Sequence, residues 1–490
     1  MLEYSHVFQL SFTLVNVWYI NTMSNDIECT MEFLLQNVAN NEMQVALETD
    51  YVSSAVINEI PGPIETAANK IPSSIITEFS IEKALQFAST PTAKVIATIH
   101  LEKNPESFTH KLVAQSKNYN KGNFMKGCKW SPDGLCFLTN SNDNSLRLFN
   151  TPSELLNNNY KNEQPYELKE CFSVKEPETV YDFCWWPLMN SQSPETCCFL
   201  TTSRDQPVHL WDAFNGSLRA SYRSINNVDE LQAAHSVCFS PDGQQLLCGY
   251  RKQVCLFYTD RPGAKFERWK TVKAKPCKSV QNNIISCVEF GPDGSMFACG
   301  CYDRTIGIYS PNNGKRLELV TAHSSGVTCL KFSADGNRLY SGARKDGSIK
   351  CWDMRWLNTP LLQFNRQVTT NQRIHFDLVY NGEILKETEL IAGSTDGNIV
   401  LWNLKEAIPE AETDVANCQV LDTQPVYAFK GHNDCVNGCS VHPYLPILLT
   451  SSGQRHFANP VDSDDEDTET LLSQNNINEE NMIKLWYIYH

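Results

Sequence analysis

A short pattern of hydrophobic and polar positions recurs seven times along the chain. Each copy has a branched aliphatic residue, any residue, an apolar residue and an aromatic residue. The copies are LRLF ending at Phe149, VHLW at Trp211, VCLF at Phe257, IGIY at Tyr309, IKCW at Trp352, IVLW at Trp402 and IKLW at Trp486. Alternation with a period of two residues predicts a β-strand. We therefore expect seven equivalent strands, one in each of seven repeats.

Tight-turn sequences precede four of these strands. They are WSPDG (Trp130–Gly134), FSPDG (Phe239–Gly243), FGPDG (Phe290–Gly294) and FSADG (Phe332–Gly336). Asp-Gly suits a turn because glycine accepts a positive φ, and proline presets φ at the position before. Further strand-like runs fill each repeat, with no helical periodicity between them. Repeats of four strands at this spacing predict an all-β, seven-bladed β-propeller, whose closed ring leaves no open sheet edge.

The last repeat ends at its third strand, because the chain stops at His490. The missing fourth strand must come from elsewhere, and HKLVAQS (His110–Ser116) lies directly before the first repeat. We expect this segment to pair with the C-terminal strand and so to close the ring.

One repeat carries four side chains that form the internal hydrogen-bond set of a WD repeat. They are His323, Ser341, Asp346 and Trp352. Asp143, Asp205, Asp303 and Asp396 repeat the turn aspartate, whereas the third and seventh blades have Arg251–Lys252 and Arg455 in its place. The same His, Ser and Asp could be assembled on paper into a catalytic triad. The tryptophan in its expected position favours the structural role, in which each buried polar group finds a partner.

No other motif suggests an enzyme. The chain has no GxSxG elbow, no glycine-rich phosphate loop with lysine and no HExxH zinc motif. Its 19 cysteines include no CxxC pair, so we expect reduced thiols and no metal. No apolar run is long enough to span a membrane. We therefore expect a non-enzymatic protein without cofactor, membrane anchor or small-molecule substrate.

Acidic residues concentrate in two segments. Residues 1–90 hold 11 acidic and two basic residues, and residues 457–480 hold eight acidic and no basic residues. Together they account for the net charge of −15, which leaves the rest of the chain close to neutral. We interpret residues 1–105 as an acidic, mostly disordered N-terminal region and residues 106–490 as the propeller. Residues 457–481 are then an acidic loop insertion in the last blade.

Basic residues recur in the turns between the second and third strands of the blades, which all point to one face of a propeller. They are Arg204, Arg251, Lys252, Arg304, Arg344, Lys345 and Arg455, with Tyr250 and Tyr302 interleaved. Basic side chains suit phosphate, and aromatic rings stack on unpaired bases, which makes Tyr302 a stacking candidate. Turn residues are commonly polar for other reasons. The turns alone leave a nucleic acid and a protein partner both open.

Several longer segments resemble the telomerase Cajal body proteins, which are WD-repeat proteins. They are KGCKWSPDG (Lys126–Gly134), HLWDAFNGSLRASYR (His209–Arg223), DELQAAHSVCFSPDG (Asp229–Gly243), GNRLYSGARKD (Gly336–Asp346), VTTNQRI (Val368–Ile374) and SGQRHF (from Ser452). The resemblance covers about residues 120–490. The N-terminal region resembles the family only in its acidity.

The resemblance implies a nuclear protein that binds the CAB box, a short loop element of small Cajal-body RNAs, and concentrates these H/ACA-type particles in Cajal bodies. It also implies the core proteins of H/ACA particles as partners, and telomerase RNA where that RNA carries the element. Arg344, Lys345, Arg373 and Arg455 lie in the shared segments and are the RNA-binding candidates that it supports. Arg204, Arg251, Lys252 and Arg304 rest on the turn pattern alone. The alternative is a WD-repeat scaffold for proteins without direct RNA contact.

Overall fold

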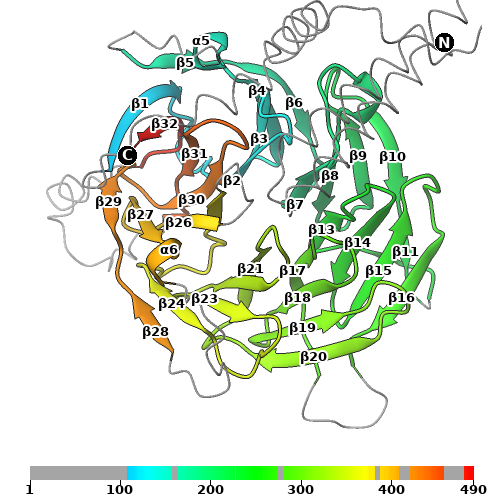
Figure 1. Cartoon of the computed structure of the whole chain (residues 1–490). Coiled ribbons are helices and arrows are strands. Elements are labelled where there is room, and N and C mark those ends of the chain that lie inside the picture. The colour runs from blue at the N-terminus through cyan, green and yellow to red at the C-terminus, as the bar shows by residue number, and fades with distance from the viewer. Residues whose placement is uncertain are drawn as a thin grey trace, which may run out of the picture. The chain divides into compact units, whose positions relative to one another are not determined.

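The computed structural model describes residues 108–156, 164–226, 228–272, 280–380, 387–407, 420–456 and 479–489. These residues form a ring of seven β-sheets (Figure 1), which confirms the predicted seven-bladed β-propeller. The acidic N-terminal region and most of the acidic insertion lie outside the described residues, so their predicted disorder stays a prediction.

The first four blades follow one another along the chain, and each has four antiparallel strands. Blade 1 contains β2 (Met125–Trp130), β3 (Cys136–Ser141), β4 (Ser145–Asn150) and β6 (Glu170–Lys175). Blade 2 contains β7 (Val180–Trp185), β8 (Cys198–Ser203), β9 (Val208–Asp212) and β10 (Leu218–Tyr222). Blade 3 contains β13 (Ser236–Phe239), β14 (Gln245–Tyr250), β15 (Gln253–Tyr258) and β16 (Phe266–Lys270). Blade 4 contains β17 (Ile285–Phe290), β18 (Phe297–Cys301), β19 (Thr305–Tyr309) and β20 (Arg316–Thr321).

The last three blades add two strands that the sequence pattern does not predict. Blade 5 contains β21 (Val327–Phe332), β22 (Arg338–Ala343), β23 (Asp346–Asp353), β24 (Leu362–Asn365) and the added β28 (Leu421–Thr423). Blade 6 contains β25 (Phe376–Tyr380), β26 (Glu387–Gly393), β27 (Asn398–Asn403) and β29 (Tyr427–Lys430). Blade 7 contains β30 (Val436–Val441), β31 (Ile447–Ser452), β32 (Ile483–Tyr489), β1 (Thr109–Ser116) and the added β5 (Tyr166–Leu168).

Short elements connect the blades. A two-stranded hairpin of β11 (Ser224–Ile225) and β12 (Leu231–Gln232) joins blades 2 and 3. Among the described residues the helices are single turns, namely α5 (Ser153–Leu156), η4 (Pro194–Thr196) and α6 (Leu404–Ala407).

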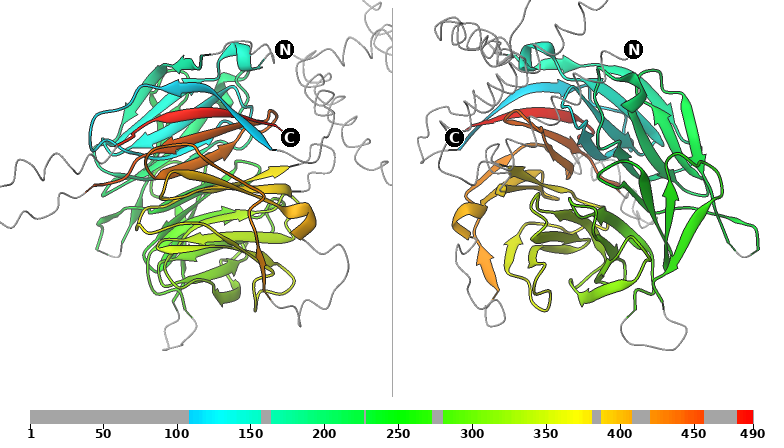
Figure 2. Two further views of the ribbon diagram at one scale, coloured as in Figure 1. Left: turned by 90° about the vertical axis from the view of Figure 1, so that its left-hand side faces the viewer. Right: turned by 45° about the vertical axis from the view of Figure 1, so that its right-hand side comes forward.

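The N- and C-terminal strands of the propeller pair to close the ring. β1 runs antiparallel to β32, with Lys111 opposite Tyr487, and the two strands lie side by side in each view (Figures 1 and 2). The Ser116 hydroxyl accepts a hydrogen bond from the Ile483 amide at 3.0 Å, at the other end of the pair. This pairing confirms the closure predicted from HKLVAQS.

The hydrophobic core lies between neighbouring blades. The central strands are buried on both faces, because each sheet packs against two others. Between blades 2 and 3, for example, Leu200, Tyr222, Leu246 and Phe257 are all fully buried. Burial on both faces explains the continuous apolar runs in β8 and β14, and it holds the turns at both ends of each blade in fixed positions.

Candidate nucleic-acid interface

The turns between the second and third strands of the blades share one face of the ring, because every blade repeats the same up-and-down order of strands. We call this the turn face. It carries the predicted binding residues Arg204, Arg251, Lys252, Tyr302, Arg304, Arg344, Lys345 and Arg455. Five of these cations are exposed, namely Arg204, Arg251, Arg304, Lys345 and Arg455. The face therefore offers positive charge on blades 2, 3, 4, 5 and 7.

Two predicted residues from different blades stack on each other. The Arg344 guanidinium of blade 5 lies over the Tyr302 ring of blade 4, 4.1 Å from its centroid. A Cβ at Gly326 would lie 3.0 Å from Cδ1 of Tyr302 and 3.2 Å from Nε of Arg344, so a larger residue there would press on the pair, and glycine lets the backbone pack closely against it. Both side chains are half-buried. The stack is thus held in place before any ligand arrives.

A second aromatic pair, which sequence reasoning missed, joins blades 2 and 3. The rings of Tyr181, at the start of β7, and His235, just before β13, have centroids 5.0 Å apart. Burial raises the pKa of Tyr181, and the positive charge of Arg204 opposes this rise. We call Tyr181, His235, Tyr302 and Arg344 the aromatic shelf.

Arg373 lies inside the ring rather than on an exposed turn. Its guanidinium forms an ion pair with Asp182 of β7 at 3.1 Å and donates a hydrogen bond to the Ser286 carbonyl of β17. Burial alone would lower its pKa, but the Asp182 charge outweighs this and raises it. The positive charge of Arg373 is therefore largely used to join blades 2 and 4, and it is less available to a ligand than the charges on the turns.

The other cations of the turn face differ in whether their charge is paired with an acidic side chain. Arg204 pairs with Asp205 at 3.3 Å in an exposed position. Arg304 and Lys345 have φ values of 76° and 49° and are exposed. The Lys345 amide donates to the Thr370 carbonyl at 3.1 Å. These backbone contacts fix the turns while the side chains face solvent.

Blade 3 has a turn with two cations and no acid. Lys252 adopts a φ of 64°, and its amide donates to the Asn283 carbonyl at 2.9 Å. Arg251 forms a β-bridge with Ile284. Tyr250, the second tyrosine noted in the sequence, is only 2% exposed and packs in the core. Tyr250 therefore cannot stack on a ligand, because the alternation of β14 turns it inward.

The blade 5 residues singled out in the sequence form one hydrogen-bond network. Trp352 Nε1 donates a hydrogen bond to Ser341 Oγ at 2.8 Å, and the same oxygen lies 2.8 Å from His323 Nε2. On the other side of the imidazole ring, His323 Nδ1 lies 3.2 Å from Asp346 Oδ2. Burial lowers the pKa of His323, which keeps it neutral. Burial would raise the pKa of Asp346, but hydrogen bonds from His323 and Ser348 hold it well below its usual value. The network pins Asp346 at the turn.

Blade 7 contains an equivalent network built with threonine and glutamate, which the sequence pattern did not predict. Trp486 Nε1 donates to Thr450 Oγ1 at 2.9 Å, Thr450 Oγ1 lies 2.8 Å from His432 Nε2, and His432 Nδ1 lies 2.6 Å from Glu480 Oε1. Hydrogen bonds from His432 and Lys484 outweigh burial and lower the pKa of Glu480 to about 2. Glu480 and Asn481, which the sequence assigned to the acidic insertion, are buried.

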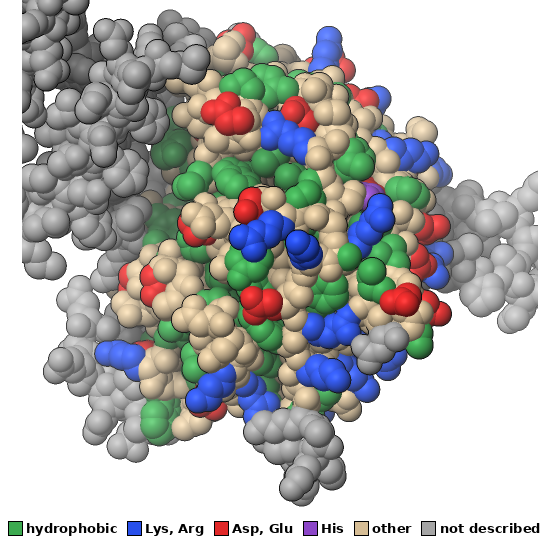
Figure 3. Space-filling model, turned by 90° about the vertical axis from the view of Figure 1, so that its right-hand side faces the viewer, with side chains coloured by type: hydrophobic (Ala, Val, Ile, Leu, Met, Phe, Trp, Pro, Cys, Tyr) green, Lys and Arg blue, Asp and Glu red, His purple; other side chains and the backbone are tan. Residues whose placement is uncertain are grey.

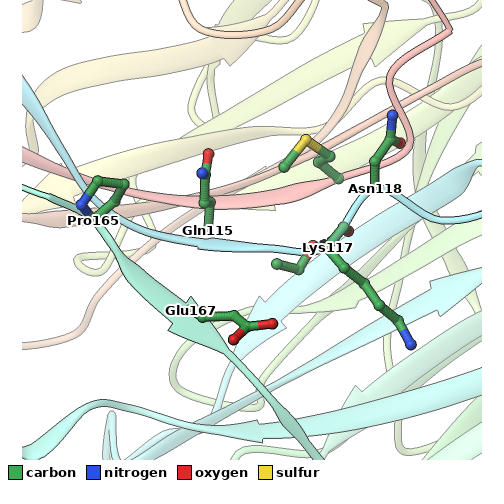
Figure 4. A pocket seen from close by; sticks show the side chains of 7 residues that line it. Gln115, Lys117, Asn118, Pro165 and Glu167 are labelled. Atoms are coloured by element: carbon green, nitrogen blue, oxygen red, sulfur yellow. Dashed lines mark hydrogen bonds between the residues drawn. The ribbon is translucent and has the colours of Figure 1, made fainter.

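A pocket of about 310 Å³ opens beside the closing strands (Figure 4). Gln115, Lys117 and Asn118 line it from β1 and the segment after it, and Pro165 and Glu167 line it from the β5 side. Ligand pockets are usually apolar with a few polar groups. This lining is mostly polar and carries both signs of charge, so we assign it no ligand.

The described residues contain no group of three or more His, Cys, Asp or Glu side chains that could hold a metal. Every cysteine among them is a free thiol, and most are buried. None of the helices in this part of the chain is long and apolar enough to cross a membrane.

Comparisons with known proteins agree with this architecture. The family described as WD domain, G-beta repeat matches residues 116–150, 274–310, 314–353 and 423–456. Telomerase Cajal body protein 1 of Bos taurus is 46% identical over 369 residues, which cover 74% of this chain and 65% of that protein. The homolog from Drosophila melanogaster is 36% identical, over 68% of this chain and 58% of that protein. The chain thus matches less than two thirds of the length of these relatives.

A guanine nucleotide-binding protein negative regulator of Schizosaccharomyces pombe is 32% identical, over 59% of this chain and 72% of that protein. The repeats and the closed ring define the chain as a WD-repeat β-propeller. Within that class, the chain belongs to the family that includes telomerase Cajal body protein 1.

Proposed function

We propose that the chain is a non-enzymatic RNA-binding scaffold whose aromatic shelf holds an unpaired RNA loop. The loop is the CAB box of small Cajal-body RNAs of the H/ACA type, and of telomerase RNA where that RNA carries the element. The chain then directs these particles to Cajal bodies in the nucleus, in contact with H/ACA core proteins. The names of its relatives, which join telomerase to the Cajal body, support this assignment.

The observation that carries the proposal is the stack of Arg344 on Tyr302 within a cationic face. A single-stranded loop exposes base faces, which stack on aromatic rings and guanidinium planes, and phosphates, which attract cations. Base–aromatic stacking contributes about 1–3 kcal/mol per base. A preformed stack avoids the cost of ordering these side chains on binding.

A different observation favours a second candidate, a protein-interaction scaffold without direct RNA contact. The turns between first and second strands lie on the face opposite the turn face. In blades 7, 1 and 2 these turns expose Tyr444, Leu135 and Leu188, whereas blades 3, 4 and 5 have Gln244, Ser295 and Asn337 in the corresponding stretch. Exposed apolar side chains gathered on neighbouring blades are typical of protein contact surfaces.

Crosslinking of RNA in cells, followed by sequencing, distinguishes the two candidates. The wild-type chain is compared with the double variant Tyr302→Ala/Arg344→Ala. The matched control is Tyr258→Ala/Arg261→Ala, which removes an arginine–tyrosine contact of 5.4 Å at the opposite end of blade 3.

We expect small nuclear RNAs with the loop element to be enriched by the wild type and the control, and at least tenfold less by the shelf variant. Absence of enrichment with the wild type would favour the protein scaffold.

A further inference from the structure

We propose that the double-stranded stem next to the bound RNA loop lies across the outer part of blade 3. There its phosphates contact Arg251, Lys252 and Lys270, which we call the cation track. This inference rests on the proposed RNA binding and adds the path that the RNA takes away from the aromatic shelf.

The turn of blade 3 differs from the other turns in its charge. Aspartates occupy the corresponding turns of blades 1, 2, 4, 5 and 6, namely Asp143, Asp205, Asp303, Asp346 and Asp396. Blade 3 has Arg251 and Lys252 instead, and neither forms an ion pair with another described residue. In blade 2, by contrast, Asp205 takes up the charge of Arg204. The blade 3 turn therefore keeps its positive charge for a ligand.

Lys270 extends this charge toward the rim of the ring. It lies opposite Gln253 at the end of the outermost strand β16, and the amide of Thr271 donates to the Lys252 carbonyl at 3.0 Å. Lys270 and Arg251 are both exposed. The view of this side of the propeller shows several Lys and Arg side chains on the rim, with Asp and Glu side chains between them (Figure 3). Lys270 therefore continues the positive charge of the blade 3 turn onto the outermost strand of the blade.

The cation track is joined directly to the aromatic shelf. Segment 282–284 lies between the turns of blades 3 and 4. Its Asn283 carbonyl accepts a hydrogen bond from the Lys252 amide, and its Ile284 carbonyl accepts one from the Tyr302 amide at 3.0 Å. Arg251 also forms its β-bridge with Ile284. An RNA strand that leaves Tyr302 and passes over blade 3 would thus contact these cations next.

The side chains of the cation track suit a duplex rather than a continued single strand. The nearby aromatic residues are turned away, because Tyr250 is in the core and Trp269 stacks on Phe297 with centroids 5.9 Å apart. Without an exposed aromatic ring, this surface favours contacts to phosphates over stacking on a series of bases. Double-stranded RNA hides its bases and is bound mainly through its phosphates, 2′-hydroxyls and shape. In this arrangement the aromatic shelf binds the loop of an RNA hairpin, and the cation track binds its stem.

The test measures binding of two fluorescent RNAs by fluorescence anisotropy. One is a hairpin with the CAB-box loop and a stem of about ten base pairs, and the other is the same loop as a linear strand. The track variant is Arg251→Ala/Lys252→Ala/Lys270→Ala. The control, Arg261→Ala/Lys265→Ala/Lys315→Ala, removes three exposed cations from the opposite ends of blades 3 and 4 and changes the net charge equally. Thermal unfolding checks that all variants fold.

We expect the track variant to bind the hairpin at least tenfold more weakly, with a salt slope lower by roughly three, and to bind the linear loop within about twofold of the wild type. The control variant should match the wild type with both RNAs. Equal losses on both probes, or no loss on the hairpin, would overturn the stem assignment while leaving RNA binding intact. If the wild type binds neither probe, the proposed function itself fails, and this inference fails with it.

Discussion

Blades 5 and 3 have different buried side chains at matching positions of their second and third strands. Leu339 pairs with Trp352 in blade 5, and Leu246 pairs with Phe257 at the matching position of blade 3. By the same register, Ser341 corresponds to Cys248. The polar network of blade 5 is thus replaced in blade 3 by two fully buried apolar side chains.

The difference decides what the turn above each core can do. In blade 5 the network needs an ionised Asp346 at the turn, since its carboxylate lies 3.2 Å from His323 Nδ1. In blade 3 the matching positions, Cys248 and Phe257, present no such polar network to satisfy, so the turn is free to carry Arg251 and Lys252. An apolar core under a turn releases that turn for binding, whereas a polar network fixes its charge.

The largest expected effect comes from removing the hydroxyl at the centre of the blade 5 network. Ser341→Ala leaves Trp352 Nε1 and His323 Nε2 without their partner in a fully buried site. Burying two unsatisfied groups should lower the free energy of unfolding by about 3 kcal/mol. The matched change Cys248→Ala in blade 3 breaks no such network and should cost about 1 kcal/mol. Denaturant unfolding monitored by tryptophan fluorescence measures both, and equal losses would contradict the comparison.

A smaller effect is expected from acid. The pKa of Asp346 is held well below its ordinary value of 3.8 in the folded chain. The unfolded chain therefore takes up a proton near pH 3.8 while the folded chain does not, so the stabilisation is present above that pH and is lost as the pH falls below it. Asp346→Asn should destabilise the chain by about 2 kcal/mol at pH 7 and by much less near pH 3. If Asp346→Asn lowers the free energy of unfolding equally at pH 7 and pH 3, the charge of Asp346 contributes nothing to stability.

The next expected effect makes the turn of blade 3 resemble that of blade 5. Lys252→Asp replaces a cation by an acid at a φ of 64°, which aspartate tolerates better than most residues. We expect the affinity for the hairpin RNA to fall about tenfold, because a phosphate contact is replaced by repulsion. The midpoint of thermal unfolding should change little. If anisotropy shows an unchanged RNA affinity, the turn of blade 3 does not take part in RNA binding.

The sequence predicted the features that depend on local repetition. Seven alternating strands and the turns before them define the blades, and the chain ends define the closure, so these follow from periodicity alone. The blade 5 network lies within one short stretch, from His323 to Trp352. The blade 7 network was missed because Glu480 is separated from Ser452 by the acidic insertion, and because Thr450 and Glu480 replace serine and aspartate.

The candidate site depends more on contacts between blades, which a single sequence does not reveal. Tyr302 and Arg344 were each proposed, but their stacking joins two blades. Tyr181 and His235 belong to different blades and look like ordinary strand residues in the chain. Arg373 lies in a segment shared with the family, yet its partner Asp182 comes from a distant strand. The pairing of strands within a blade can be predicted from the sequence, whereas the contacts between side chains of different blades cannot.

The salt dependence of RNA binding tests the central claim most directly, namely that the turn face contacts RNA phosphates and bases. The dissociation constant of the CAB-box hairpin is measured over a series of salt concentrations with the wild type, Arg344→Ala and Arg261→Ala. We expect the logarithm of the association constant to fall linearly with log salt, with a slope lower by roughly one for Arg344→Ala and unchanged for Arg261→Ala. Binding that does not depend on salt, or equal slopes for all three proteins, would contradict the account.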